Sequence, residues 1–67
     1  MKNLPTLEEL HQVAKQYARR AIYDERNMVW IFFDEIGRVL LLADEYQFLP
    51  KSEKQEVLKS FKQWLNS

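Results

Sequence analysis

Two short apolar runs, with the chain's only glycine between them, constrain the fold more than any other feature of this sequence. The runs are Val29–Phe33 and Val39–Ala43, and both consist of β-branched, aromatic and aliphatic residues. Residues of these types favour strands, and runs of five residues are too short for independent helices. The runs therefore predict two strands, at about 28–34 and 38–44, that pair as a β-hairpin.

The loop of this hairpin is predicted from the position of Gly37. A two-residue turn would force the β-branched Ile36 to a positive φ, which such residues resist. A three-residue loop of Glu35, Ile36 and Gly37 needs a positive φ only at the glycine. This loop pairs Asp34 with Arg38 and so fixes the register of the two strands.

Amphipathic helices are predicted on both sides of the hairpin, at about 7–23 and 53–65. In both segments apolar residues recur every three or four positions, and acidic residues precede basic ones, which suits the helix dipole. The N-terminal capping boxes are Thr6 with Glu9 and Ser52 with Gln55. The predicted fold is therefore a single α+β domain, residues 1–67, in the order α-β-β-α.

Both faces of the predicted hairpin are apolar, whereas a sheet that is covered on one side alternates apolar and polar residues. One face carries Val29, Ile31, Phe33, Val39, Leu41 and Ala43; the other carries Met28, Trp30, Phe32, Leu40 and Leu42. Two helices with one apolar stripe each cover one face well, and the aliphatic face is their expected partner. The residues of the other face are then the predicted interface. In the alternative, one helix packs on each face and both faces belong to the core.

An uncovered face of this composition predicts association, because aromatic side chains bury about 150–250 Å² each and monomers rarely expose such patches. Both strands are also sheet edges without proline or internal charge, and such edges pair readily. A homodimer is expected, and pairing through the faces and pairing through the edges both fit the sequence.

Three large apolar residues follow the second strand, in a connection where polar residues are the rule. They are Tyr46, Phe48 and Leu49. They are candidate anchors for a partner, since aromatic residues are common at interfaces. Equally, they are candidate caps for the open end of a small core.

Charge is balanced, with ten basic and ten acidic side chains, which argues against a dedicated nucleic-acid or polybasic membrane protein. Lys15, Arg19 and Arg26 fall on one flank of a continued first helix, and Arg20 lies further round. These four are the candidate phosphate contacts of an alternative function, a nucleic-acid-binding regulatory module. A solvated helix face is the preferred interpretation.

Acidic pairs occur at Asp24–Glu25, Asp34–Glu35 and Asp44–Glu45. In the hairpin the first and third pairs fall at the same end of the sheet, and the second falls at the turn. Clustered carboxylates are suited to a hard cation or to a basic partner, but in a simpler interpretation charges beside apolar strands suppress aggregation. The simpler interpretation is preferred.

The chain offers little for catalysis. It has no cysteine and one histidine, His11, at the margin of the first apolar stripe, without a companion set of metal ligands or acid–base partners. It has no glycine-rich phosphate loop and no nucleophile elbow. No enzyme activity, metal or cofactor is predicted.

No apolar run approaches the about twenty residues that cross a bilayer, and the N-terminus lacks the apolar stretch of a signal peptide. The expected compartment is the cytoplasm, without membrane association. The predicted function is a small non-enzymatic protein–protein interaction module, such as an adaptor, an antitoxin-like protein or an inhibitor. It is expected to be homodimeric through its hairpin and to occlude a surface of another protein.

Overall fold

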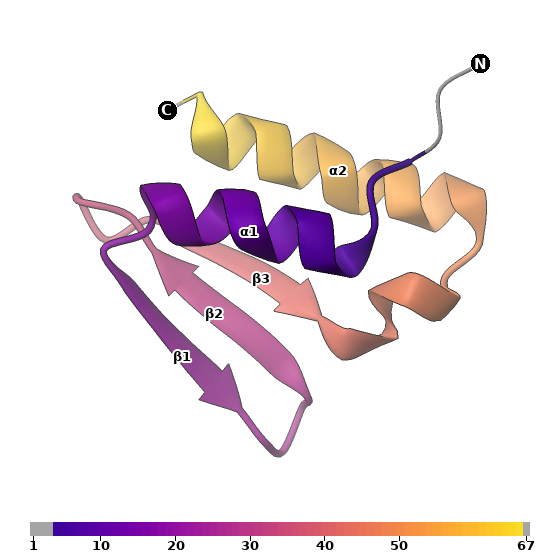
Figure 1. Cartoon of the computed structure of the whole chain (residues 1–67), viewed down its shortest axis with the longest axis horizontal. Helices are drawn as coiled ribbons and strands as arrows, with labels where there is room; N and C mark the ends of the chain where they lie inside the picture. Colours follow the sequence, from indigo (N-terminus) through magenta and orange to yellow (C-terminus); the bar gives the residue numbers. More distant parts are fainter. Residues whose placement is uncertain (1–3, 67) are drawn as a thin grey trace.

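The computed structural model describes residues 4–66, which form two α-helices, a three-stranded sheet and a short 3₁₀ helix (Figure 1). The elements are α1 (Leu7–Tyr17), β1 (Arg20–Asp24), β2 (Val29–Phe33), β3 (Val39–Ala43), η1 (Asp44–Phe48) and α2 (Lys51–Leu65). The sheet is an antiparallel meander in the order β1-β2-β3. The α+β class is therefore confirmed, with one strand more than the sequence predicted.

The extra strand is β1, so the order is α-β-β-β-α and the predicted helix 7–23 is too long. Helix α1 ends where Ala18 turns to an extended conformation and its N–H closes the last turn on the carbonyl oxygen of Ala14, at 2.8 Å. The following segment pairs with the free edge of β2, from Arg20 opposite Phe33 onward. Pairing with β2 satisfies the backbone groups of this segment that face β2, and tertiary context of this kind overrides a weak helical preference.

The two α-helices begin in different ways. At α1 the predicted capping box is confirmed, because Thr6 Oγ1 accepts from the Glu9 N–H at 3.1 Å and Glu9 Oε1 accepts from the Thr6 N–H at 2.8 Å. At α2 the predicted cap at Ser52 is wrong, since the N-cap is Pro50 and makes no side-chain hydrogen bond. Its carbonyl oxygen accepts from the N–H groups of Glu53 and Lys54, at 3.0 Å each, so the helix begins at Lys51.

The β2–β3 hairpin has the predicted three-residue loop. Gly37 has a φ of 86°, and the Asp34 N–H donates to the carbonyl oxygen of Arg38 at 3.0 Å. The Asp34 carboxylate also accepts from the N–H groups of Ile36 and Arg38, at 3.0 and 2.7 Å. The register that follows pairs Phe33 with Val39, as expected, and each strand is one residue shorter at each end.

The helices cover the face of the sheet that was predicted to be open. Phe32 and Leu42 are 0% exposed, and Leu40 is also buried, so this part of the predicted interface is core. Both α1, through Leu10 and Ala14, and α2, through Phe61 and Trp64, contribute to the same core. The interpretation with one helix on each face is therefore also wrong. This face carries the larger side chains, which gain more from burial because they remove more apolar area from water.

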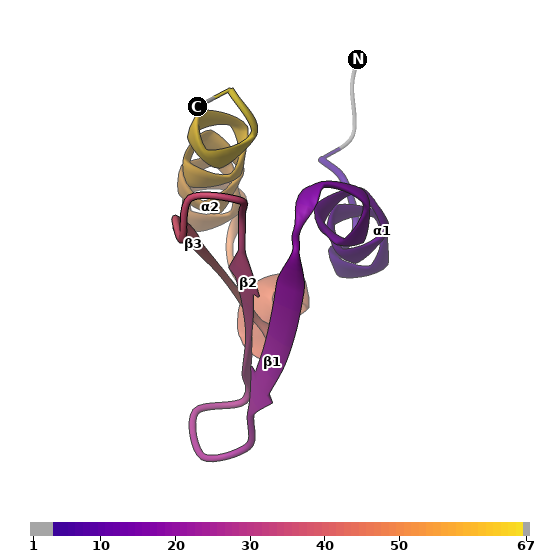
Figure 2. The same ribbon diagram turned by 90° about the vertical axis from the view of Figure 1, so that its left-hand side faces the viewer.

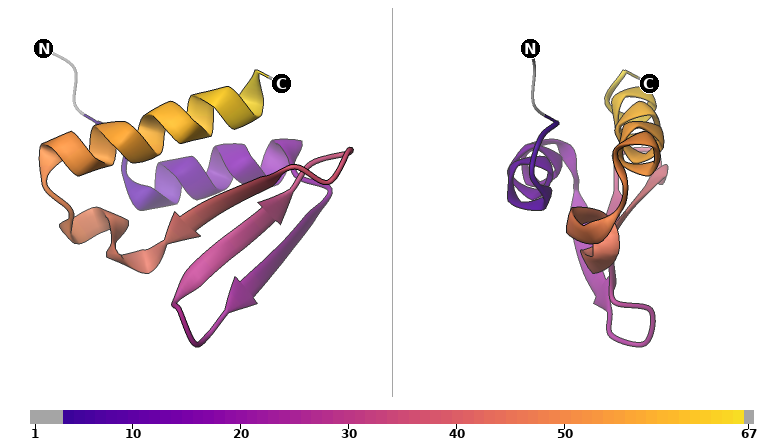
Figure 3. Two further views of the ribbon diagram at one scale, coloured as in Figure 1. Left: turned by 180° about the vertical axis from the view of Figure 1, so that it is seen from behind. Right: turned by 90° about the vertical axis from the view of Figure 1, so that its right-hand side faces the viewer.

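The opposite face of the sheet lies open. Figure 2 shows α1 on one side of the sheet and α2 beside β3, and seen from behind, no helix of the described residues lies over the strands (Figure 3, left). The described helices thus leave one face of the sheet free, as expected, but it is the opposite face from the one predicted: α1 lies on the face with Phe32 and Leu42, and α2 packs against the edge strand β3.

Candidate functional site

The open face of the sheet exposes apolar side chains from all three strands. We define the open face by six apolar side chains from all three strands: Ile22, Val29, Ile31, Phe33, Val39 and Leu41. Leu41 is 56% exposed and Val39 50%, while Val29, Ile31 and Phe33 are half-buried among their neighbours. Three strands about 4.8 Å apart, each with five residues rising about 3.3 Å, span roughly 14 by 17 Å. Strands of this type normally place such residues against a partner layer.

The register arranges the open face in rows across the strands. Ile22, Ile31 and Leu41 form the central row. The two charged side chains of this face lie on β1, on either side of that row: Arg20 toward one end of the sheet and Asp24 toward the other. The open face therefore has an apolar centre, with the positive charge of Arg20 toward one end and the negative charge of Asp24 toward the other.

Both charged groups are held in place. The Arg20 guanidinium lies over the Phe33 ring, 5.9 Å from its centroid. The Asp24 carboxylate accepts from Asn27 Nδ2 at 2.8 Å and from the Arg26 N–H at 3.0 Å. These hydrogen bonds, chiefly that from the Asn27 side chain, hold the pKa of Asp24 below its usual value. Asp24 is therefore an anion at neutral pH.

The residues predicted as an interface are divided between the core and the surface. Phe32, Leu40 and Leu42 lie in the core, and Trp30 packs partly buried against it. Only Met28 is largely exposed, at 58%, and it lies in the β1–β2 turn with a φ of 53°. Alternation along the strands correctly placed Trp30, Phe32, Leu40 and Leu42 on one face of the sheet. The face that remains uncovered, however, is the opposite one, the open face.

A second apolar surface lies at the end of the sheet where β1 turns into β2 and β3 leads into η1. A hollow of about 390 Å³ is lined by Asn27, Met28, Asp44, Glu45, Gln47 and Phe48. Asp44 joins its two sides, because its N–H donates to the Met28 carbonyl oxygen at 2.9 Å and its carboxylate accepts from the Tyr23 hydroxyl at 2.6 Å. We call this feature the η1 hollow.

The three candidate anchors after β3 have different environments. Tyr46 is buried, and its hydroxyl donates to the Pro5 carbonyl oxygen at 2.8 Å. Leu49 packs against the core. These two residues close the end of the core, whereas Phe48 is 82% exposed beside the η1 hollow.

His11 belongs to the packing between α1 and the sheet. Its ring lies edge-on to those of Trp30 and Phe32, with centroids 5.5 Å away in both cases. Burial is the main cause that lowers the pKa of His11; the positive charge of Lys15 adds to this, and Asp44 opposes it. Across the described residues, no group of three or more histidine, aspartate or glutamate side chains is placed to hold a metal ion.

The structure does not bring the candidate phosphate contacts onto one helix flank. Lys15 lies on α1, while Arg19 and Arg20 lie where β1 begins. Arg26 lies in the turn after β1, at the other end of that strand. The predicted grouping is wrong because α1 ends at Tyr17. The acidic pairs fall as expected, with Asp24–Glu25 and Asp44–Glu45 at the same end of the sheet.

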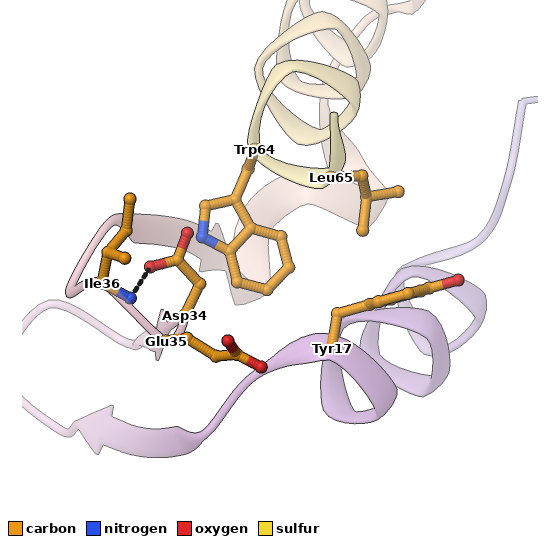
Figure 4. A pocket seen from close by; sticks show the side chains of 6 residues that line it. All are labelled: Tyr17, Asp34, Glu35, Ile36, Trp64 and Leu65. Atoms are coloured by element: carbon orange, nitrogen blue, oxygen red, sulfur yellow. Dashed lines mark hydrogen bonds between the residues drawn. The ribbon is translucent and has the colours of Figure 1, made fainter. Parts of the chain in front are cut away.

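A further hollow, of about 210 Å³, lies at the opposite end of the sheet (Figure 4). It is lined by Tyr17, Asp34, Glu35, Ile36, Trp64 and Leu65. The Asp34 carboxylate is used by the backbone of its own loop, and Trp64 Nε1 donates to the Arg38 carbonyl oxygen at 3.2 Å. The Trp64 bond, together with that from the Arg38 guanidinium to the Gln63 carbonyl oxygen at 3.3 Å, joins the end of the β2–β3 loop to α2.

Comparison with family models, curated proteins and solved structures gives no match for this chain. Neither α1 nor α2, the two α-helices of residues 4–66, is both long and apolar enough to cross a membrane.

Proposed function

We propose that this chain is a non-enzymatic protein–protein interaction module of the cytoplasm that acts as a homodimer, with the open face of the sheet as the dimer interface. One observation carries the proposal: all three strands expose apolar side chains on the face that the helices leave free, with Leu41 and Val39 at least half exposed. Apolar surface of this kind is stabilised when a second layer covers it.

A second copy of the chain is the occupant that fits this face, because the face is complementary to itself. A two-fold axis between two stacked sheets, running across the strands, places each strand antiparallel over its own counterpart. The central row with Ile31 then meets itself, and the large Phe33 of one copy lies over the small Val29 of the other. Arg20 of each copy lies over Asp24 of the other, so opposite charges meet at both ends.

The expected dimer is weak and reversible. The flat area of the open face is on the order of 240 Å² from strand spacing and rise. A standard stable interface buries about 800 Å² on each partner. We therefore expect a dissociation constant on the order of 10–100 µM rather than nanomolar affinity.

Molar mass in solution, measured by sedimentation equilibrium from about 5 to 500 µM, tests the proposal. The wild-type mass should rise from 8.1 kDa toward twice that value with concentration. Leu41→Lys should stay monomeric at every concentration, because two ammonium groups would meet in the central row of the interface. Ser60→Lys, on the exposed surface of α2, adds the same charge elsewhere and should dimerise like the wild type.

Two results would overturn this assignment. A folded wild-type chain that stays at 8.1 kDa over the whole range would show that the open face does not pair with itself. A dimer that survives Leu41→Lys and protects the β1 backbone amides from hydrogen exchange would show pairing through the strand edge. Circular dichroism of Leu41→Lys confirms that the variant is folded, as the exposure of Leu41 leads us to expect.

A further inference from the structure

Phe48 is the most exposed of the large apolar side chains that the structure describes. It is the last residue of η1 and lines the η1 hollow together with Met28, which is also more than half exposed. Two apolar side chains, the flexible Met28 and the aromatic Phe48, thus flank one concave surface. Methionine adapts its shape to an apolar partner, and phenylalanine offers a rigid one.

The support beneath this hollow is well fixed. Tyr46, in the same 3₁₀ helix, is buried and bonded to Pro5, and its carbonyl oxygen accepts from the Leu49 N–H at 3.1 Å. On the other side, the bonds from Asp44 to Met28 and Tyr23 hold the turn against η1. Phe48 is therefore exposed on η1, which these hydrogen bonds hold in position, so a ligand would bind to a preformed surface.

The backbone of Met28 adds a second observation. Its φ of 53° lies in the left-handed region, where glycine or asparagine is the usual residue. A methionine there costs about 1 kcal/mol of strain. The strained position is occupied by a side chain that contributes apolar surface to the hollow.

The charge around the η1 hollow is negative. Asp44 and Glu45 line it, and Glu25 begins the adjacent turn, while Arg26 is the single basic side chain of that turn. Lys54, whose Nζ lies 5.5 Å from the centroid of the Tyr46 ring, is also near η1, but no basic side chain of the described residues lines the hollow itself. A nucleic acid or an acidic peptide would be repelled here, and a basic peptide would be attracted.

We infer that the η1 hollow binds a basic segment of a partner protein, which seats one apolar side chain between Met28 and Phe48 and directs lysine or arginine toward Glu45 and Glu25. This site rests on the proposed function as an interaction module, but it uses a surface apart from the open face. The dimer would then present two such hollows to its target.

The test uses two fluorescein-labelled decapeptides and the full chain, with binding followed by fluorescence anisotropy. One peptide carries a central leucine flanked by lysines, and the other carries the same leucine flanked by glutamates. The basic peptide should bind, should bind more weakly as salt is raised, and should shift the amide resonances of residues 27–28 and 44–48. The acidic peptide should not bind.

Matched variants locate the contact. Phe48→Ser and Glu45→Lys should each weaken binding of the basic peptide by about tenfold or more, because each removes one half of the recognition. Ile36→Ser, an equally exposed apolar residue at the other end of the sheet, and Glu56→Lys, on exposed α2, should bind like the wild type. Phe48 is exposed, so Phe48→Ser should stay folded.

The inference is overturned if the basic peptide does not bind at millimolar concentration, if the acidic peptide binds equally, or if Phe48→Ser matches Ile36→Ser. Its failure is distinguishable from failure of the dimer proposal. Phe48→Ser should leave the molar mass unchanged, while Leu41→Lys should abolish the dimer and still bind the peptide. Each measurement therefore tests one surface.

Discussion

The two faces of the sheet come from the same strands and have nearly the same composition, yet they differ in what covers them. Leu42 and Leu41 are adjacent in β3; the first is fully buried and the second is more than half exposed. Alternation along a strand puts neighbouring side chains on opposite faces of the sheet. The packing of the helices determines which of the two faces is buried. Hydrophobicity alone therefore does not tell core from interface in this chain; the packing of α1 and α2 does.

The largest predicted effect contrasts these two leucines. Leu42→Ala should destabilise the protein by about 2–5 kcal/mol, because it leaves a cavity in a closed core. That loss is comparable to the total stability of a small domain, about 5 kcal/mol at the lower end. Leu41→Ala should cost less than about 1 kcal/mol in the monomer, since it leaves no cavity. Urea unfolding at low protein concentration measures both, and equal losses would contradict the assignment of the faces.

A smaller effect is expected for the hydroxyl that closes the end of the core. Tyr46→Phe removes the hydrogen bond to the Pro5 carbonyl oxygen and should cost about 1 kcal/mol. Tyr17→Phe removes a hydroxyl from a side chain that is mainly exposed, and should leave the free energy of unfolding unchanged. Thermal unfolding of the two variants compares them directly. If Tyr46→Phe were as stable as Tyr17→Phe, the bond to Pro5 would contribute nothing.

Loss of the N-terminal cap of α1 should lower the stability by as much as Tyr46→Phe or slightly less. Thr6→Ala removes the side-chain acceptor at the start of α1 and should cost about 0.5–1 kcal/mol. Ser52→Ala should be neutral, because α2 begins at Pro50 without a side-chain cap. Chemical denaturation measures the free energy of unfolding of both variants. A loss of stability in Ser52→Ala would show that Ser52 caps α2 after all, as the sequence predicts.

The smallest effect concerns pH and His11, on the covered side of the sheet. Its pKa is lower in the folded than in the unfolded chain, where it is near 6.5. The folded protein therefore binds a proton less readily, and the stability contribution is complete above pH 6.5 and declines as the pH falls below that value. His11→Phe should show a flatter dependence of stability between about pH 7.5 and 5.5. Parallel profiles for the two proteins would show that burial of His11 has no influence.

Local features of the fold were predictable from the sequence. The two apolar runs, the three-residue loop ending at Gly37 and the capping box of Thr6 depend on residues close together in the chain, and all three are present. Strand β1 was missed because Ala18, Ala21 and Ile22 continue the helical spacing, while the edge of β2 that recruits this segment lies elsewhere in the sequence.

The candidate site was predictable only in part. Alternation sorted the side chains of β2 and β3 into the correct two groups, but both groups are apolar, so it held no information on which one the helices cover. That choice depends on how Ala14 of α1 and Trp64 of α2 join Phe32 in one core, which brings together distant segments of the chain. Phe48 was among three candidate anchors, and only the structure separates it from Tyr46 and Leu49.

The order of the strands has a consequence for how the molecule forms. Each strand of the meander pairs with its neighbour along the chain, so the sheet assembles from local contacts and should form rapidly. The two helices lie at opposite ends of the chain, and the segment just before α1 is joined to η1 by the hydrogen bond from Tyr46 to Pro5, 41 positions apart. A newly formed sheet without docked helices would expose apolar side chains on both faces. Docking of both helices is therefore expected to remove this apolar surface from contact with other chains.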